Sequence, residues 1–283
     1  MAYQTVFKRY ELKYLMTAEQ KQRVLASMEP YMIMDKYGDS TIRNIYFDTD
    51  DYILARHSIL KPDFKEKLRI RSYSQADADS TVFVELKRKY DHVVYKRRVG
   101  LPEIAAMDWI CGTGHNEPET DPQKGDEIRY FRNYYKDLRP AAFISYERQA
   151  YKLRKTEDIP PELRGNIGSD TGFRVTFDQN ILFRDYDMSL RSEVYGERIL
   201  PEGMTLMEIK CSGGIPLWMV KVLSEEYIYK TSFSKYGTAY TNKLFNNSAT
   251  AEWQPAQAKE LKEEQHAGQF TGKHLRYTTC YIN

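Results

Sequence analysis

The residues of this chain best suited to chemistry are lysines, arginines and glutamates that occupy every second position of several short segments. Lys67, Arg69 and Arg71, for example, alternate with apolar residues. The same spacing occurs in Arg9, Glu11 and Lys13; Glu85, Lys87 and Lys89; Lys96 and Arg98; Tyr146 and Arg148; and Glu208 and Lys210. Arg and Lys bind phosphate oxygens, and carboxylates bind hard divalent cations. The pattern therefore predicts a site for a polyanion and a metal.

These segments read as β-strands, because side chains alternate between the two faces of a strand. The strands would form one charged face and one apolar face. If the apolar face were inside, the result would be a sandwich with many exposed cations. If the charged face lined a closed barrel, helices would cover the apolar face outside. Amphipathic helical segments favour the barrel, whose cationic lumen would be stabilised by a bound anion.

Composition indicates one large domain with a local excess of positive charge. The 283 residues are 41% hydrophobic and 13% aromatic, which suffices for a substantial core. The net charge is only +2, yet residues 61–98 contain 11 basic and 6 acidic side chains, a local balance of +5. This distribution fits a focused phosphate site and argues against a non-specific nucleic-acid binder.

Cysteine and histidine usage excludes several site classes. The three cysteines are too few and too far apart for a disulfide framework, and the five histidines show no metal-binding spacing. There is also no apolar run of about 20 residues and no signal-peptide pattern. We therefore expect a cytoplasmic protein without a membrane segment. Short glycine pairs do not form a phosphate loop, so side-chain cations must bind the anion.

Four helices are predicted between the strands. Thr17 and Gln20 form a capping box for a helix that ends near Met28. A second helix is predicted from Glu103 to Cys111, closed by Gly112. The third would begin at Asp126 and place Ile128, Phe131, Tyr135 and Leu138 on one face, and the fourth would follow Pro216 and turn Met219, Val222, Leu223 and Tyr227 inward.

The chain is predicted to divide into a folded domain over residues 1–248 and a polar C-terminal segment over residues 249–283. The segment is rich in Ala, Gln, Glu and Lys and contains no obvious chemistry. We interpret it as a helical or flexible tail.

Seven segments in order give the chain a resemblance to a known family. They are Phe7 to Tyr14, Ile45 to Thr49, Lys67 to Arg71, Phe83 to Lys87, Arg174 to Asp178, Met207 to Lys210 and Phe233 to Tyr236. Together they resemble the VTC-type polyphosphate polymerase domain of the triphosphate tunnel metalloenzyme (CYTH-like) superfamily. The resemblance implies an α+β fold built on an eight-stranded antiparallel β-barrel with a charged lumen and helices outside. It also implies binding of ATP and inorganic polyphosphate, and use of Mn²⁺ or Mg²⁺.

The resemblance also implies a role for individual residues. Phosphate contacts and catalysis are assigned to Lys13, Arg69, Arg71, Lys87, Lys96, Arg148, Arg174 and Lys235. Tyr146 would lie beside the nucleotide and Ser234 would also contact the ligand, while Glu208 would bind the metal, with Glu11 and Glu85 as further metal ligands. For Glu11 and Glu85 an equally good interpretation is that each pairs with a neighbouring cation.

The implied activity is transfer of the terminal phosphoryl group of ATP to a growing polyphosphate chain. Two positions depart from the family pattern. Arg9 stands where many tunnel hydrolases have a carboxylate, which argues against hydrolysis, and Ser232 stands where eukaryotic polymerases have a second lysine. The alternatives are a tunnel triphosphatase, a less favoured nucleotide cyclase, and a non-catalytic polyphosphate-binding module. No protein partner can be predicted.

Overall fold

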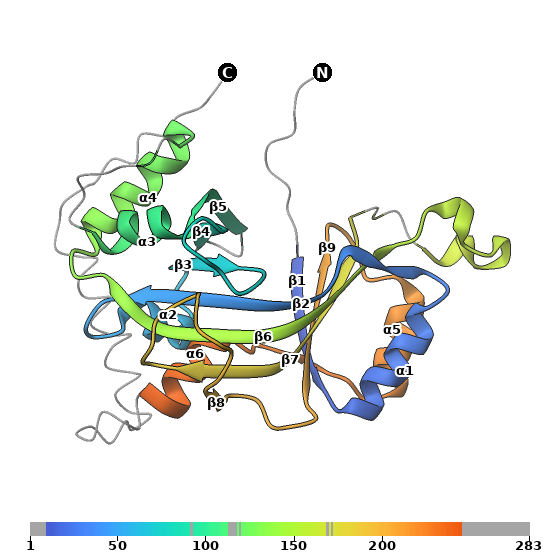
Figure 1. Cartoon of the computed structure of the whole chain (residues 1–283). Helices are drawn as coiled ribbons and strands as arrows, with labels where there is room; N and C mark the ends of the chain where they lie inside the picture. Colours follow the sequence, from blue (N-terminus) through green and yellow to red (C-terminus); the bar gives the residue numbers. More distant parts are fainter. Residues whose placement is uncertain are drawn as a thin grey trace. The chain divides into compact units, whose positions relative to one another are not determined.

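A single antiparallel sheet organises the computed structural model of the protein, which describes residues 10–90, 93–112, 118, 120–167, 170 and 172–244. Nine of its ten strands follow the order β10-β1-β9-β7-β6-β2-β3-β4-β5, and the tenth, β8, pairs with β7 (Figure 1). The strands are β1 (Tyr10–Met16), β2 (Met32–Asp48), β3 (Phe64–Ser72), β4 (Thr81–Tyr90), β5 (Val93–Pro102), β6 (Arg139–Leu153), β7 (Arg174–Arg184), β8 (Glu197–Arg198), β9 (Thr205–Cys211) and β10 (Lys230–Thr231).

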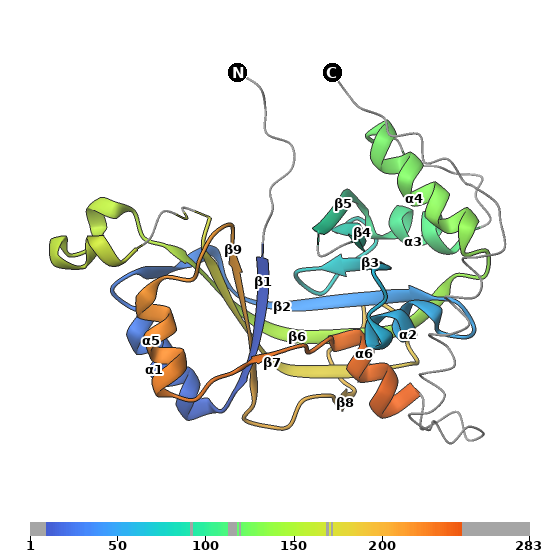
Figure 2. The same ribbon diagram turned by 180° about the vertical axis from the view of Figure 1, so that it is seen from behind.

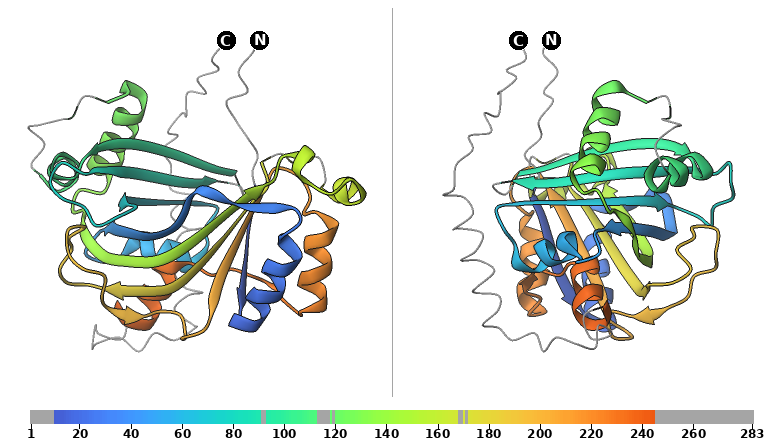
Figure 3. Two further views of the ribbon diagram at one scale, coloured as in Figure 1. Left: turned by 45° about the vertical axis from the view of Figure 1, so that its right-hand side comes forward. Right: turned by 90° about the vertical axis from the view of Figure 1, so that its left-hand side faces the viewer.

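Eight of these strands have at least seven residues, and β8 and β10 have two each. The sheet curls so that its two ends approach each other (Figure 3). Within the described residues, however, no hydrogen-bonded ladder joins β5 to β1 or β10. An ion pair between Lys87 of β4 and Glu11 of β1, 3.3 Å long, spans this gap instead. The described sheet is therefore curled and antiparallel as predicted, but it is not a closed barrel.

Local sequence signals placed three of the helices correctly. α1 (Ala18–Met28) has the predicted capping box, in which Thr17 accepts from the Gln20 backbone and Gln20 accepts from the Thr17 backbone. α3 (Glu103–Cys111) ends at Gly112, and α5 (Leu217–Glu225) begins after Pro216. The segment after β6 contains two short 3₁₀ helices, Thr156–Asp158 and Pro161–Asn166.

Other helix predictions were wrong or incomplete. α4 (Pro122–Tyr134) is capped by Asp121 rather than Asp126, because the Asp-Pro pair supplies both a capping carboxylate and a first-turn proline. Tyr227 was predicted to face inward, but it lies beyond α5 with 75% of its surface exposed. The short helices α2 (Ile53–Leu60) and α6 (Lys235–Ala239), the latter followed by the π-helix Tyr240–Leu244, were not predicted.

The apolar face of the sheet packs beneath helices, as predicted. α1 and α5 lie side by side and cover one part of this face, where Val24 and Met28 join Met219 and Val222 in a core (Figures 1 and 2). α3 and α4 cover the part formed by β3, β4 and β5, where Trp109 and other helical residues contact apolar strand residues. Burial of these surfaces provides most of the driving force for folding.

The opposite, inner face is apolar at one end and charged over the rest. At the apolar end, Tyr46 stacks on Tyr236 of α6 with ring centroids 4.9 Å apart, and Ile144 joins the same core. α2 contacts α6 there (Figure 2). This helix pair fixes the position of the inner-face residues at the start of α6. None of the helices in the described residues has the length and apolar character needed to cross a membrane.

Candidate functional site

Cross-strand register brings the predicted cations into neighbouring rows on the inner face. Lys87 of β4 lies between Lys67 of β3 and Lys96 of β5. In the next row, Glu85 lies between Arg69 and Arg98. Toward the other end of the strand order, on the same inner face, Lys13 of β1 pairs in register with Glu208 of β9, and Glu11 pairs with Lys210. The alternation read from the sequence therefore predicted the correct face of each strand.

Glu85 is the counter-ion for cations from β3 and β5. Its side chain is 1% exposed. The carboxylate lies 2.7 Å from Arg69 Nη2, 2.6 Å from Lys96 Nζ and 3.2 Å from Arg98 Nε. Burial would raise the pKa of Glu85, but Arg69, Arg71 and Lys96 hold it well below its usual value. Glu85 thus remains ionised and holds several guanidinium and ammonium groups in place.

Asp178 and Glu208 form a second carboxylate centre. Arg148 donates two hydrogen bonds to Asp178, at 2.6 and 2.7 Å, and lies 3.6 Å from Glu208. Lys235 lies 2.5 Å from Asp178 and 3.4 Å from Glu208, while Lys13 lies 3.5 Å from Glu208. Burial opposes ionisation of Glu208, yet Lys235, Lys13 and Arg148 keep its pKa well below the usual range. Four strands, β1, β6, β7 and β9, and α6 therefore meet at this centre.

Tyr146 connects the two carboxylate centres. Its hydroxyl accepts a hydrogen bond of 2.9 Å from Arg71, which also donates to Asn44. Lys235 Nζ lies 4.4 Å from the centre of the Tyr146 ring, and the Arg148 guanidinium lies 5.1 Å from it. Cations over an aromatic face are stabilised by its quadrupole. These contacts make Tyr146 a residue that positions the cations. Because its side chain is only 2% exposed, no ring face is open to a nucleoside base.

The N-terminus of α6 is held at the site by buried polar contacts. Ser234 caps the helix by accepting from the Gly237 backbone, and Lys67 Nζ lies 3.1 Å from the Ser234 hydroxyl. In the first turn of α6, Tyr236 donates to Asp48 at 2.7 Å. Asp48 also accepts from backbone N–H groups at the start of α2. These bonds join α2 and α6 to the end of β2 and so position Ser234 and Lys235.

Lys67 and Lys210 of the inner face have no carboxylate within 4 Å among the described residues. Lys67 has no ion pair within 4 Å in the described structure, although Lys13, Lys87 and Arg69 are near enough to repel it. Burial and this repulsion set the pKa of Lys67 well below its usual value. Burial also lowers the pKa of Lys210. A bound polyanion would supply the negative charge that these groups lack.

The structure brings together most of the residues predicted for the site. Arg174 is set apart, because it pairs with Asp35 and no ion pair joins it to the two carboxylate centres within the described residues. The roles assigned to individual residues left out Lys67, Arg98, Lys210 and Asp178. The alternation had placed the first three on the predicted charged face, but no individual role was given to them. The alternation also places Asp178 on the charged face, because Asp178 shares a strand face with Arg174 four residues earlier.

The carboxylates predicted to bind metal differ in how well they suit it. Within the described residues, no three His, Cys, Asp or Glu side chains form a cluster able to hold a metal. Glu11 and Glu208 lie 3.6 and 3.5 Å from the same Lys13 ammonium. One or two carboxylates together with phosphate oxygens suffice for Mg²⁺, so this pair fits a metal that arrives with a triphosphate. Glu85 fits less well because cations already surround it.

Comparison with known proteins assigns the chain to a family. The model of the VTC domain matches residues 8–161 and 162–243, which is most of the chain. The protein therefore belongs to the VTC domain family. No curated protein matches the sequence at a significant level.

Two solved structures show a distant likeness to the chain. A putative adenylate cyclase from Bacillus halodurans has 16% identity and a TM-score of 0.46, over 85% of this chain and 96% of that one. A putative adenylyl cyclase from Hippeastrum, described as having a dominant triphosphatase activity, has 17% identity and a TM-score of 0.41, over 82% and 95% of the two chains. These values are too low to support an argument about activity.

Proposed function

We propose that this protein transfers the terminal phosphoryl group of ATP to a growing inorganic polyphosphate chain. The observation that carries the proposal is the charge imbalance of the inner face. Ten cations, Lys13, Lys67, Arg69, Arg71, Lys87, Lys96, Arg98, Arg148, Lys210 and Lys235, accompany four carboxylates, Glu11, Glu85, Asp178 and Glu208. An excess of partly buried cations is costly unless an anion of high charge occupies the face. Membership in the VTC domain family supports the same substrate class.

The residues present suit phosphoryl transfer by positioning and charge stabilisation. A terminal oxygen of polyphosphate would attack the γ-phosphorus of ATP in line, lengthening the polymer by one phosphate as the bond to ADP breaks. Arg69, Arg71 and Arg148 have planar guanidinium groups suited to phosphate oxygens, and their salt bridges and hydrogen bonds fix their directions in advance. Glu208 with Glu11 would hold Mn²⁺ or Mg²⁺, which supplies charge neutralisation to the triphosphate.

The test is incubation of the purified protein with ATP and Mn²⁺ or Mg²⁺, with and without a short polyphosphate primer. Long polymer and ADP are expected, detected by gel electrophoresis and by chromatography. Orthophosphate without polymer would instead identify a triphosphatase. Binding without any product would identify a polyphosphate-binding module.

Two variants connect the product to the site. Glu208→Gln should abolish turnover, because the carboxylate proposed to hold the metal is lost while a side chain of similar size remains. Lys221→Ala is the control, because the Lys221 side chain is 74% exposed on α5 and makes a surface ion pair of 3.9 Å with Glu225. Full activity in Glu208→Gln would refute the role given to this carboxylate.

A further inference from the structure

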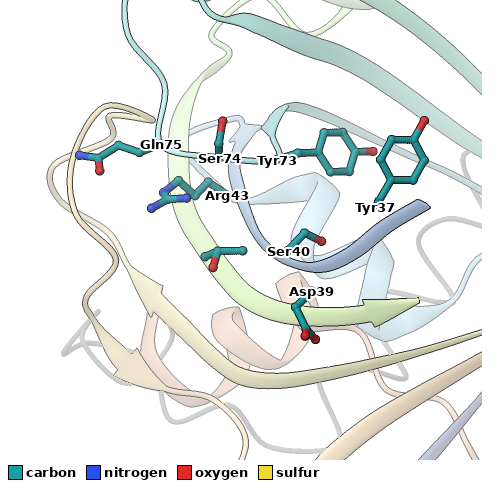
Figure 4. Close-up of a pocket in the computed structure, with 8 residues that line it drawn as sticks. Tyr37, Asp39, Ser40, Arg43, Tyr73, Ser74 and Gln75 are labelled. Carbon is teal, nitrogen blue, oxygen red and sulfur yellow. The ribbon is translucent and has the colours of Figure 1, made fainter. Parts of the chain in front are cut away.

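A pocket of about 450 Å³ opens where β3 stops pairing with β2. The β2–β3 ladder ends at Arg43 opposite Ser72, whereas the β2–β6 ladder continues to Asp39. The β2 edge beyond Arg43 has no neighbouring strand on the β3 side in the described sheet, and this edge lines the pocket (Figure 4). The volume lies in the range typical of small-ligand pockets.

Two tyrosines form one end of this pocket. Tyr37 comes from the bent part of β2 and Tyr73 from the segment after β3, and Figure 4 shows both rings at the same end. Tyr37 is 65% exposed and Tyr73 is 39% exposed. Exposed aromatic faces are stacking platforms for nucleobases. Lys36 Nζ lies 5.0 Å from the centre of the Tyr37 ring, but the ring remains largely exposed, whereas Tyr146 is 2% exposed and cannot stack on a base.

Polar groups suited to a sugar or a base edge line the rest of the pocket. The hydroxyls of Ser40 and Thr41 have no protein hydrogen-bond partner in the described part of the chain. Arg43 is 7% exposed and has no carboxylate within 4 Å among the described residues. Burial lowers the pKa of its guanidinium, with only partial compensation from Glu193. A ligand with hydrogen-bond acceptors would satisfy these donors.

The pocket adjoins the phosphate-binding cations. Tyr73 accepts a hydrogen bond of 2.6 Å from Arg98, whose Nε lies 3.2 Å from Glu85. The Arg71 guanidinium lies 5.9 Å from the Tyr73 ring. At the pocket's other side, Ser40 pairs in register with Arg148. A triphosphate held by these arginines would therefore have its organic end directed toward Tyr37 and Tyr73.

We propose that this pocket, between the free edge of β2 and the segment after β3, binds the nucleoside of the triphosphate donor, with its base stacked on Tyr37. The inference rests on the proposed function, because it uses the same cations for the phosphates. It places the nucleoside away from Tyr146, the residue that the family resemblance puts beside the nucleotide. It also makes Tyr37 a specificity-determining residue that distinguishes ATP from inorganic triphosphate.

The test compares Tyr37→Ala with the wild-type protein by calorimetry, using ATP and inorganic triphosphate as separate ligands in EDTA so that metal-dependent turnover does not interfere. ATP should bind about fivefold or more weakly, as expected for loss of one base stack, whereas the affinity for triphosphate should stay within about twofold. Tyr37→Phe should restore ATP binding because it retains the ring. Tyr130→Ala, at a 66% exposed tyrosine of α4, should change neither affinity.

Each alternative result has a separate meaning. Unchanged ATP affinity in Tyr37→Ala, or equal weakening of both ligands, would overturn the nucleoside pocket while leaving the phosphate site standing. Wild-type protein that binds triphosphate but not ATP would do the same. Wild-type protein that binds neither ligand would overturn the proposed function together with the pocket.

Discussion

Replacement of Glu85 by Gln tests the idea that buried carboxylates hold the inner face together. The Glu85 side chain is 1% exposed and lies within 4 Å of Arg69, Arg71, Lys96 and Arg98. Glutamine keeps the shape but removes the charge, so four cations lose a common counter-ion. Removing one member of a buried ion pair costs about 3–5 kcal/mol. Arg69, Lys96 and Arg98 are 20%, 42% and 37% exposed, so solvent screening favours the lower value, about 3 kcal/mol.

The free energy of unfolding would be measured by urea denaturation with far-UV circular dichroism at pH 7 and low salt. For a domain of this size, a loss of about 3 kcal/mol corresponds to a decrease of about 6–12 °C in Tm. Inorganic triphosphate should raise the Tm of Glu85→Gln more than that of the wild type, because the uncompensated cations bind it more tightly.

Glu225→Gln is the matched control, because its carboxylate is 59% exposed and 3.9 Å from Lys221. Its effect should be below about 0.5 kcal/mol. If Glu85→Gln also changed stability by less than about 0.5 kcal/mol, the inner-face ion pairs would not support the fold, and our account of Glu85 would be refuted.

Two further predictions concern Lys96 and Asp48. Burial lowers the pKa of Lys96 to about 8, with partial compensation from Glu85, so the free protein loses this positive charge as the pH rises through that value. Triphosphate affinity, measured by calorimetry, should fall about tenfold between about pH 7 and pH 9. Lys96→Arg should reduce this fall because arginine stays charged. An identical fall in the wild type and in Lys96→Arg would exclude Lys96 as its cause. Asp48→Asn should lower the free energy of unfolding by about 2 kcal/mol in urea denaturation. The reason is that the buried carboxylate accepts hydrogen bonds from backbone N–H groups at the start of α2 and from the Tyr236 hydroxyl. Asp51→Asn, at a side chain 61% exposed, should change it little, and equal effects would contradict the anchoring role of Asp48.

Local periodicity predicted the inner face, because a strand has a period of two whatever its neighbours are. Lys67, Arg69 and Arg71 therefore lie where the alternation put them. Caps at Thr17 and Gly112 predicted helix ends for the same reason, since a cap acts within a few residues.

Partners and short helices could not be predicted in this way, because they depend on residues far apart in the sequence. The link between Lys235 and Asp178 joins positions 57 residues apart, and Arg174 pairs with Asp35 across 139 residues. Alternation alone gives no reason to choose these partners. Likewise, α6 has five residues and lacks the length for a clear helical period, so its position follows from the stacking of Tyr236 on Tyr46.

If the substrate is polyphosphate, as proposed, the gap between the ends of the sheet has a consequence for how the polymer would reach the site. In the described residues, an ion pair between Lys87 and Glu11 crosses this gap where a closed barrel would have backbone hydrogen bonds. An ion pair can exchange its carboxylate for a phosphate without unravelling a strand ladder. A polymer many times longer than the protein could then be laid in sideways along its middle, instead of being threaded from a free end. Ionic strength, which weakens such pairs, would set how long a chain stays bound before it slips out through the side.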